Sequence, residues 1–376
     1  MRVLSLFDGM ACGMLALSEA GIDVERYVAY EIDKYAVETA KHNFPIIEEK
    51  GDVFTADFKE YAGFDFIVGG SPCTYWSIAQ TKNRETVASG MGWELFSQYV
   101  RALREVKPKY FIYENNKSMS KAIRESISNT FGFEPICINS ALVSAQNRQR
   151  LYWVGIRQED GTYRKADIVQ PRDMGIEIKD ILDNYMTVSY GDAVLEPVCV
   201  ASRGRNPENP SSRAAGEILE QRFEAHTDGK TNTLTTVSKD NLIAEPINVT
   251  GSQKSHTLKA QYAKNGIANF ITNGGFGASA VAVGTAEKAA DSYEVRNGNI
   301  EVKGKQYPIK LKDGFYKIRK LTVAECKRLQ TVPDWYEFPV CNSQAYKMLG
   351  NGWTVKVIAH LIKGVMDDVA GKPIEL

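Results

Sequence analysis

Polar or reactive residues come directly after four short apolar runs in the first 155 residues of this 376-residue chain. Helix-length amphipathic stretches, among them Lys34–Asn43 and Glu94–Val106, separate the runs. This alternation predicts a doubly wound, Rossmann-like α/β domain in which helices cover both faces of a parallel sheet. Ligands bind beyond the carboxyl ends of strands in such sheets, so chemistry is expected there. The runs are Val3–Phe7, Tyr27–Tyr30, Phe64–Val68 and Tyr110–Tyr113, and a fifth strand is predicted at Leu151–Ile156.

The first run leads into a turn with glycines at Gly9 and Gly13, a spacing that lets the backbone approach a ligand closely. The turn lacks the complete G-x-G-x-x-G pattern, which disfavours a dinucleotide and allows a nucleoside-type ligand. Glu31 follows the second run and is placed to accept ribose hydroxyls, and Asp52 is placed to receive an adenine amino group. Each carboxylate taken alone is more often a surface charge.

A cysteine follows the third run, in the sequence Gly69-Gly70-Ser71-Pro72-Cys73. A thiol held after a strand by a rigid proline and flanked by glycines is placed as an exposed nucleophile. The alternative is a buried core cysteine, the commonest fate of a free thiol. Glu114-Asn115, after the fourth run, favours the nucleophile, because a nucleophile needs a partner that activates its electrophile.

A third candidate element is the segment that precedes the strand predicted at Leu151–Ile156. Alternate residues of an extended segment point to one face, so Gln146, Arg148 and Arg150 are expected to project together. Two guanidinium groups suit carbonyl or phosphate oxygens, and they favour the ionised form of a nearby thiol. The alternative is a surface loop before an edge strand.

Composition narrows the classes of protein. Six cysteines without a C-x-x-C pair and four scattered histidines argue against a metal site, and free thiols are typical of the reducing cytoplasm. The longest uncharged stretch, Asn265–Ala286, is too polar to span a membrane. Because 46 basic residues balance 46 acidic ones, a purely electrostatic DNA binder is excluded. We expect a soluble cytoplasmic protein without a metal or membrane partner.

From about Asp173 onward Asn, Ser, Thr and Gly dominate and periodicity weakens. We predict a smaller β-rich region inserted into the first domain, with turns at Gly274-Gly275 and Asn297-Gly298. Helices at Val323–Leu329 and Val355–Val365 then return to the first domain. The expected organisation is 1–172, an inserted region 173–315 and a returning segment 316–376.

Charge is unevenly spread along the chain. Residues 303–328 contain nine Lys or Arg and two acidic residues, a net charge of +7, whereas residues 1–66 contain 6 basic and 13 acidic residues, a net charge of −7. The basic stretch suits a polyanion, and the acidic sheet edge suits a cationic cofactor. The alternative is that both are ordinary solvated faces.

Six motifs occur together in a fixed order, and with them the chain resembles the cytosine-C5 DNA methyltransferases. The resemblance covers about residues 1–157 and 316–366, and the region between them corresponds to the family's target-recognition domain. The chain departs from the common bacterial pattern at Thr74, Asn116 and Gly352, in the manner of the eukaryotic de novo enzymes and some phage-borne relatives. The motifs are Phe7-Asp8-Gly9, Ser71-Pro72-Cys73, Glu114-Asn115, Gln146-x-Arg148-x-Arg150, Arg319 to Gln330, and Gly350-Asn351.

The resemblance implies that S-adenosyl-L-methionine is the cofactor. Glu31 would hold its ribose, Ile32 would pack on its adenine and Asp52 would accept from the adenine amino group. The other residues that the resemblance assigns to the cofactor site are Phe7, Asp8, Gly9, Gly13, Val53, Pro72, Asn351 and Trp353.

The resemblance also implies a reaction on double-stranded DNA, with a cytosine flipped out of the duplex. Cys73 would add to C6, Glu114 would hydrogen-bond the N3 and N4 edge, and Arg150, with Arg148, would hold the O2 oxygen. The methyl group would pass to C5, and loss of the C5 proton would release the thiol. The residues expected to contact DNA are Ser77, Lys82 and Arg84 in a lid-like loop, Gln146, and Lys317, Arg319 and Lys320 in the basic stretch.

Three alternatives stay open beside this interpretation. One is the same chemistry on RNA, disfavoured because the inserted region is larger than the RNA-modifying branch of the family usually carries. Another is a catalytically silent DNA-binding module, which would have no need of both Cys73 and Glu114. A non-methylating Rossmann enzyme is the third. The sequence does not distinguish a member of a restriction-modification pair from an orphan or a phage enzyme, and we expect a monomer.

Overall fold

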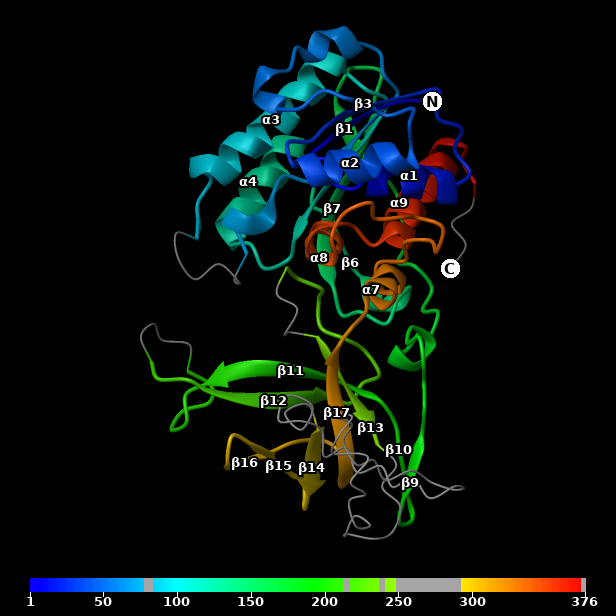
Figure 1. The fold of residues 1–376 in the computed structure, drawn as a ribbon. Coiled ribbons are helices and arrows are strands. Elements are labelled where there is room, and N and C mark those ends of the chain that lie inside the picture. The colour runs from blue at the N-terminus through cyan, green and yellow to red at the C-terminus, as the bar shows by residue number, and fades with distance from the viewer. Residues whose placement is uncertain (78–83, 213–216, 237–240, 248–291, 373–376) are drawn as a thin grey trace. The chain divides into compact units, whose positions relative to one another are not determined.

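A computed structural model of the chain describes residues 1–77, 84–212, 217–236, 241–247 and 292–372, and it divides into two compact units (Figure 1). The catalytic unit is formed by Met1–Ile176 together with Cys326–Leu376. The inserted unit is Glu177–Glu325. The predicted boundaries, after residues 172 and 315, therefore both lie earlier in the chain than the observed ones, after residues 176 and 325.

The sheet of the catalytic unit has eight strands in the order β3-β2-β1-β4-β5-β7-β6, with β8 paired to β7. Strands β3, β2, β1, β4 and β5 are parallel, which confirms the doubly wound class. The strands are β1 Arg2–Leu6, β2 Arg26–Tyr30, β3 Glu48–Glu49, β4 Phe66–Gly69, β5 Tyr110–Asn116, β6 Ile136–Asn139, β7 Gln149–Arg157 and β8 Tyr163–Lys165.

The strand predicted at Leu151–Ile156 exists as β7, but the prediction that it runs parallel is wrong. β7 is antiparallel to both β5 and β6. The physical reason is the short connection: only residues 140–148 join β6 to β7, and a parallel crossover needs a dozen residues or more. The consequence is that the amino end of β7 lies at the carboxyl end of β5, with Arg150 opposite Asn116.

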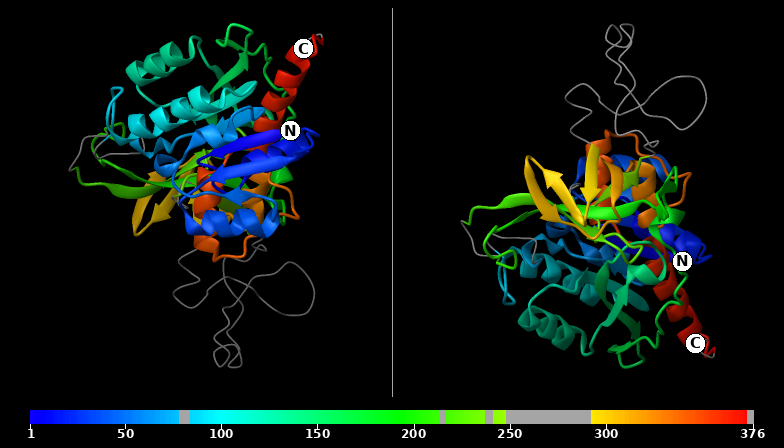
Figure 2. Two further views of the ribbon diagram at one scale, coloured as in Figure 1. Left: turned by 90° about the horizontal axis from the view of Figure 1, so that it is seen from above. Right: turned by 90° about the horizontal axis from the view of Figure 1, so that it is seen from below.

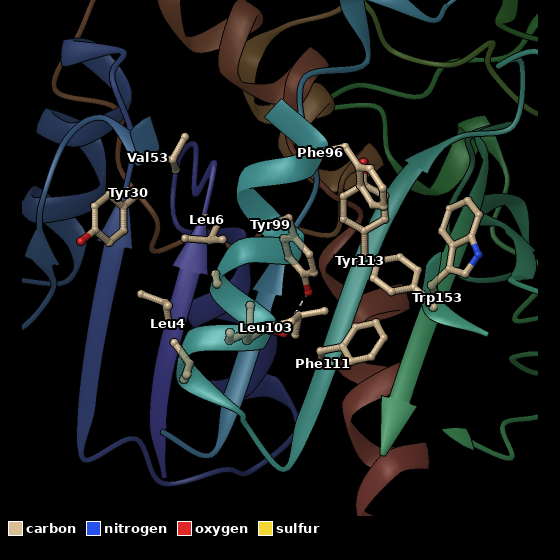
Figure 3. Packing of buried hydrophobic residues seen from close by; sticks show 14 of the residues in the cluster. Leu4, Leu6, Tyr30, Val53, Phe96, Tyr99, Leu103, Phe111, Tyr113 and Trp153 are labelled. Atoms are coloured by element: carbon tan, nitrogen blue, oxygen red, sulfur yellow. Dashed lines mark hydrogen bonds between the residues drawn. The ribbon is translucent and has the colours of Figure 1, made fainter. Parts of the chain in front are cut away.

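Helices cover both faces of this sheet. Phe96, Tyr99 and Leu103 of α3 pack over the strands in one buried cluster with Phe111 and Trp153 (Figure 3). Burial of such side chains contributes about 1.5–3 kcal/mol each. On the other side, α9 packs against α1, so the last helix of the chain lies beside the first (Figure 2). The helices are α1 Cys12–Glu19, α2 Lys34–Asn43, α3 Gly90–Val106, α4 Lys121–Phe131, α7 Val323–Leu329, α8 Asn342–Asn351 and α9 Val355–Val369.

The inserted unit contains a seven-stranded antiparallel sheet in the order β12-β11-β13-β17-β14-β15-β16 and a separate hairpin of β9 and β10. Asn297 and Gly298 form the predicted turn between β14 and β15, with φ values of 50° and 69°. The turn predicted at Gly274-Gly275 lies outside the described residues. The strands are β9 Val188–Tyr190, β10 Ala193–Leu195, β11 Val198–Arg205, β12 Glu220–His226, β13 Leu242–Pro246, β14 Ser292–Arg296, β15 Asn299–Val302, β16 Lys305–Pro308 and β17 Gly314–Lys320.

Strand β17 explains why the predicted boundary at residue 316 is wrong. Its residues pair with β13 on one side and β14 on the other, and Tyr316 and Ile318 belong to the buried core of this unit. The chain therefore completes the inserted sheet before it returns to the catalytic unit. Within the residues that the structure describes, no helix is both long enough and apolar enough to cross a membrane.

Candidate active site

A cavity of about 270 Å³ lies at the carboxyl edge of the parallel strands in the catalytic unit. Its walls come from the turn after β1, the ends of β2, β4 and β5, the start of β7, and α8 with the turn that follows it. These are the positions that the doubly wound fold predicts for a ligand. The predicted site residues that line it are Phe7, Asp8, Gly9, Glu31, Pro72, Cys73, Glu114, Arg148, Arg150, Asn351 and Trp353.

The turn after β1 brings backbone to the cavity through left-handed residues. Phe7, Gly9 and Ala11 have φ values of 58°, 61° and 58°, and no atom lies within 4 Å of a Cβ built on Gly9. Glu31 fixes the turn, because its Oε2 accepts from the Gly9 amide at 2.8 Å and its Oε1 accepts from two amides at the start of the next segment. The carboxylate predicted to hold a ribose is thus itself held in place by backbone donors.

Asp8 lines the cavity, and one of its two carboxylate oxygens is buried and unsatisfied among the described residues. Its Oδ1 accepts from Ser5 Oγ at 2.5 Å and from Tyr27 Oη at 2.6 Å, whereas its buried Oδ2 has no hydrogen-bond partner among the described residues. Burial raises the pKa of Asp8 to about 6. A ligand that carries a cationic or N–H group would satisfy this oxygen.

Four residues of the predicted cofactor set do not line the cavity. Gly13 instead makes room for Tyr27, since a Cβ there would lie 2.7 Å from the Tyr27 hydroxyl. Ile32 is 77% exposed, and Val53 is buried in the core. Asp52 caps a 3₁₀ turn by accepting from the Phe54 amide at 2.9 Å. The adenine contacts predicted for Ile32 and Asp52, and the cofactor contact predicted for Val53, stay predictions.

Cys73 begins a 3₁₀ turn, Cys73–Tyr75, and is partly exposed on the cavity wall. The chain before it is anchored from β5: Ser71 Oγ and Tyr113 Oη lie 2.7 Å apart, and Asn115 Nδ2 donates to the Ser71 carbonyl at 3.1 Å. Pro72 restricts the remaining link. The thiol is therefore held by rigid neighbours in an accessible position, as a nucleophile requires.

The carboxylate of Glu114 is held from two directions. Arg150 Nε lies 3.1 Å from Oε1, and Trp353 Nε1 donates to Oε2 at 2.9 Å. Gly70 allows this packing, because a Cβ there would lie 2.9 Å from Oε2. The antiparallel direction of β7 is what brings Arg150 to the carboxyl end of β5.

Arg148 does not share the role predicted for Arg150. Its guanidinium is buried and donates to the carbonyls of Gly350 and Gly352, the latter at 2.8 Å. Burial lowers its pKa to about 9. Arg148 therefore fixes the turn after α8, and the prediction that it acts with Arg150 on a substrate oxygen is not what this geometry favours.

The residues predicted to contact DNA differ in how accessible they are. Gln146 is fully buried and its amide donates to the Leu329 carbonyl, which leaves no surface for the predicted contact. Arg84 donates to the carbonyls of Trp76 and Ser118, and Ser77 is partly exposed. Lys82 lies outside the described residues.

The basic stretch 303–328 is not one surface. Arg319 is bound by Glu245 and, through two bonds of 2.7 Å, by Glu325, which raises its pKa well above the usual range. These ion pairs do not favour the phosphate contact predicted for Arg319, which stays a prediction. Lys327 is buried and donates to two backbone carbonyls. Lys317 and Lys320 are exposed, as the prediction requires.

Sequence reasoning missed two features of these units. One is Lys347 on α8, which lines the cavity and donates to Asp33 Oδ2 at 2.6 Å. The other is a pair of arginines in the inserted unit, where Arg203 on β11 lies directly opposite Arg222 on β12. Helical or strand spacing predicts a shared face within one element, but it does not predict which strands pair.

A doubly wound sheet with a thiol, a carboxylate and an arginine around one cavity at its carboxyl edge defines a Rossmann-like enzyme of the group-transfer class. The C-5 cytosine-specific DNA methylase family matches residues 1–367, and the chain belongs to this family. It is a DNA cytosine-5-methyltransferase.

Two relatives match over nearly the whole chain. The orphan methyltransferase M.SPRI of Bacillus phage SPR is 28% identical, and the match covers 100% of this chain and 99% of that protein. The type II methyltransferase M1.ScrFI of Lactococcus lactis subsp. cremoris is 26% identical over 99% of this chain and 79% of that protein.

Solved structures share the fold at low identity. The Dnmt2 methyltransferase of S. pombe superposes with a TM-score of 0.55 at 15% identity, covering 98% of this chain and 99% of that one. The methyltransferase EhMeth of Entamoeba histolytica gives 0.56 at 14% identity over 98% of each chain. These likenesses support the methyltransferase fold, which agrees with the fold class predicted above.

Proposed function

We propose that the enzyme methylates C5 of a cytosine flipped out of a specific duplex sequence, through a covalent bond between Cys73 and C6. The observation that carries the proposal is that Cys73 and the Glu114–Arg150 pair lie on the walls of one cavity. A thiol serves as the nucleophile, and a carboxylate with its arginine recognises the polar edge of a pyrimidine.

The cavity residues fit S-adenosyl-L-methionine, which supplies an electrophilic methyl group on a sulfonium. Asp8 Oδ2 lacks a partner and would accept from the ammonium group, and Glu31 and the open backbone at Gly9 would hold the ribose side. Asp8 and Glu31 give this part of the wall acidic character, which suits a cationic ligand. Phe7, Pro72 and Trp353 supply apolar surface.

The chain's own residues then account for activation of the base. The Cys73 thiolate forms a bond to C6, and the π pair of the C5–C6 bond shifts into a C4–C5 double bond. The π pair of the C4–N3 bond takes up a proton from water at N3, which leaves C5 as the nucleophilic carbon of an enamine. Glu114 accepts from the N4 amino group and stabilises the protonated N3 edge, with Arg150 holding the carboxylate. Once C5 carries the methyl group, a base removes the C5 proton and the C6–S bond breaks to release the thiolate.

Base flipping is part of the proposal because the ring carbons of a stacked cytosine are out of reach of a side chain. Cys73 and Glu114 approach the base through one cavity, which a base within a duplex would not enter. The enzyme therefore takes up the extrahelical nucleotide.

Two features of the inserted unit support a role in DNA recognition. Arg203 and Arg222 face each other across β11 and β12, and the nearby Glu224 carboxylate, 3.8 Å from Arg203 Nε, is shared with Arg205, so guanidinium charge is in excess here. The Nε atom of each is buried without a hydrogen-bond partner among the described residues. Phosphates or guanine edges would pair with the excess guanidinium charge, and Lys317 and Lys320 would add phosphate contacts.

The test is bisulfite sequencing of mixed-sequence duplex DNA incubated with the protein and S-adenosyl-L-methionine, with Cys73→Ala as the control. We expect protected cytosines within one short motif, at least 10³-fold fewer in the variant because the covalent route is lost. The variant should bind S-adenosylhomocysteine within a few-fold of the wild type. Protection that persists in Cys73→Ala would contradict the covalent route, and methylation of RNA alone would contradict the duplex substrate.

A further inference from the structure

We propose that Trp353 is a positioning residue that couples occupation of the cofactor cavity to the placement of Glu114. The proposal rests on the function proposed above, since it assigns the cavity to the cofactor and Glu114 to the target base. It adds a link between the two sites that neither role requires by itself.

The link is a single hydrogen bond between segments far apart in the chain. Trp353 Nε1 donates to Glu114 Oε2 at 2.9 Å across 239 residues of sequence. The indole has one N–H group and no acceptor, so this bond fixes the ring plane relative to the carboxylate. The opposite oxygen is engaged by Arg150, so Trp353 holds the side of the carboxylate that Arg150 does not.

The turn that carries Trp353 is built to be rigid. Arg148 donates to the carbonyls of Gly350 and Gly352, and Gln330 donates to the carbonyl of Gly352 at 3.2 Å. A Cβ on Gly352 would lie 3.0 Å from the Met348 carbonyl and 3.2 Å from Cys12 Sγ. A buried arginine and a buried glutamine thus support the backbone on which the indole depends.

The same indole lines the cavity assigned to the cofactor. A ligand that packs on the ring holds its N–H toward Glu114, and a fixed Glu114 holds the ring where the ligand meets it. Coupling of this kind is reciprocal, so a change at Glu114 must alter cofactor affinity through Trp353. A bound methyl donor would therefore strengthen the hold on the base-recognition carboxylate.

The experiment is a double-mutant cycle read out by binding. Calorimetry measures the affinity for S-adenosylhomocysteine of the wild type, Glu114→Ala, Trp353→Phe and the double variant. We expect each single change to weaken binding about fivefold, and the double variant to be no weaker than either, because both remove the same bond. Effects that multiply to about 25-fold would overturn the coupling.

Two controls separate coupling from general damage. Trp76 Nε1 donates to Glu85 Oε2 at 3.0 Å, and neither residue lines the cavity, so Trp76→Phe should leave cofactor affinity unchanged. Glu114→Gln keeps an acceptor for the indole and should retain wild-type affinity while losing methyl transfer. Loss of affinity in Glu114→Gln equal to that in Glu114→Ala would contradict the hydrogen bond as the link.

The kinetic signature distinguishes positioning from a structural role. Trp353→Phe should lower kcat about tenfold or more while KM for the cofactor rises about fivefold, since loss of a hydrogen bond to a charged group misplaces Glu114. An unchanged kcat would overturn the proposal. A wild-type protein that binds no S-adenosylhomocysteine would instead contradict the proposed function itself.

Discussion

The catalytic and inserted units use their charged residues in different ways. In the catalytic unit, Glu31 and Arg148 bind backbone amides and carbonyls, and Asp8 is buried by hydroxyl donors. In the inserted unit, several charged side chains bind one another, as in the pairs Arg205–Glu224 and Arg319–Glu325. Backbone partners fix a charge in one place, whereas side-chain partners can be exchanged.

The difference matches the ligands that the two units are proposed to bind. A small cofactor and one base need groups held within a fraction of an ångström, because misplacement is costly in catalysis. A DNA backbone offers many equivalent phosphates, and a protein that contacts it gains mainly by releasing counterions. Changes in the catalytic unit should therefore have large effects on rate, and changes on the inserted sheet should have small effects on affinity.

Among the changes that test this comparison between the two units, the largest effect is expected from Gly70→Ala. Its new Cβ would lie 2.8 Å from the Glu114 carbonyl and 2.9 Å from Oε2, so strand or carboxylate must move. We expect kcat to fall about 100-fold while S-adenosylhomocysteine affinity changes much less. Single-turnover methylation of duplex DNA measures the chemical step.

A suitable control for this change is Gly364→Ala on α9. There the three atoms nearest to a Cβ belong to the side chain of Ile168, the closest at 3.0 Å, and a side chain can adjust. The rate should stay within about threefold of the wild type. A Gly70→Ala enzyme as active as this control would mean that Glu114 tolerates displacement and that rigidity is not what distinguishes the catalytic unit.

An intermediate effect, on the affinity for the cofactor, is expected from the protonation of Asp8. Burial raises its pKa from 3.8 to about 6, so the carboxyl is mostly ionised at pH 7 and mostly protonated at pH 5. If the anion receives the cofactor's ammonium group, affinity should fall about tenfold between these pH values. Calorimetric titration with S-adenosylhomocysteine should show this dependence in the wild type and a flat profile in Asp8→Asn.

As pH rises, the folding stability contributed by Asp8 should fall, whereas the affinity for the cofactor should rise. Because the folded-state pKa is raised, the contribution of Asp8 to folding stability is fully present below about pH 4 and is lost as pH rises through 6. Asp8→Asn should therefore raise the Tm of the ligand-free protein at pH 7.5 and leave it nearly unchanged at pH 4. Equal shifts at both pH values would show that Asp8 is not a charge held for a ligand.

These comparisons also show what the sequence could predict. Strand positions followed from apolar runs, and Cys73 and Glu114 followed from the residues at the strand ends, because a parallel sheet brings those ends to one edge. The direction of β7 depends on the short connection from β6, which periodicity does not encode. Arg150 binds Glu114 because β7 runs in that direction, and Arg148 binds the carbonyls of the turn after α8.

Partners distant in sequence account for the other differences between the predicted and the observed contacts of site residues. Arg319 was predicted to contact phosphate because it lies in a basic stretch, and Glu245, 74 residues away, binds it in the folded chain. Trp353 was expected on the cofactor, and its bond to Glu114 spans 239 residues. Net charge over a window describes composition, whereas pairing depends on register and topology.

The smallest effect on DNA affinity is expected from the two exposed lysines of β17, Lys317 and Lys320, which are candidates for phosphate contacts. Lys317→Glu and Lys320→Glu should each weaken DNA binding a few-fold at every sequence and reduce the slope of log affinity against log salt by about 1. Fluorescence anisotropy at several salt concentrations measures both quantities.

Lys165→Glu makes the same charge change on β8 and is the matched control. β8 pairs with the end of β7 that lies away from Glu114, at the edge of the sheet opposite the cavity, and Lys165 is exposed. It should leave the salt slope unchanged, because a phosphate contact and not net charge sets the slope. If all three variants shift the slope equally, long-range attraction would explain binding, and β17 would carry only solvated charges. If only the β17 variants do so, the exchangeable charges of the inserted unit contact the DNA backbone, while sequence recognition is left to groups such as Arg203 and Arg222.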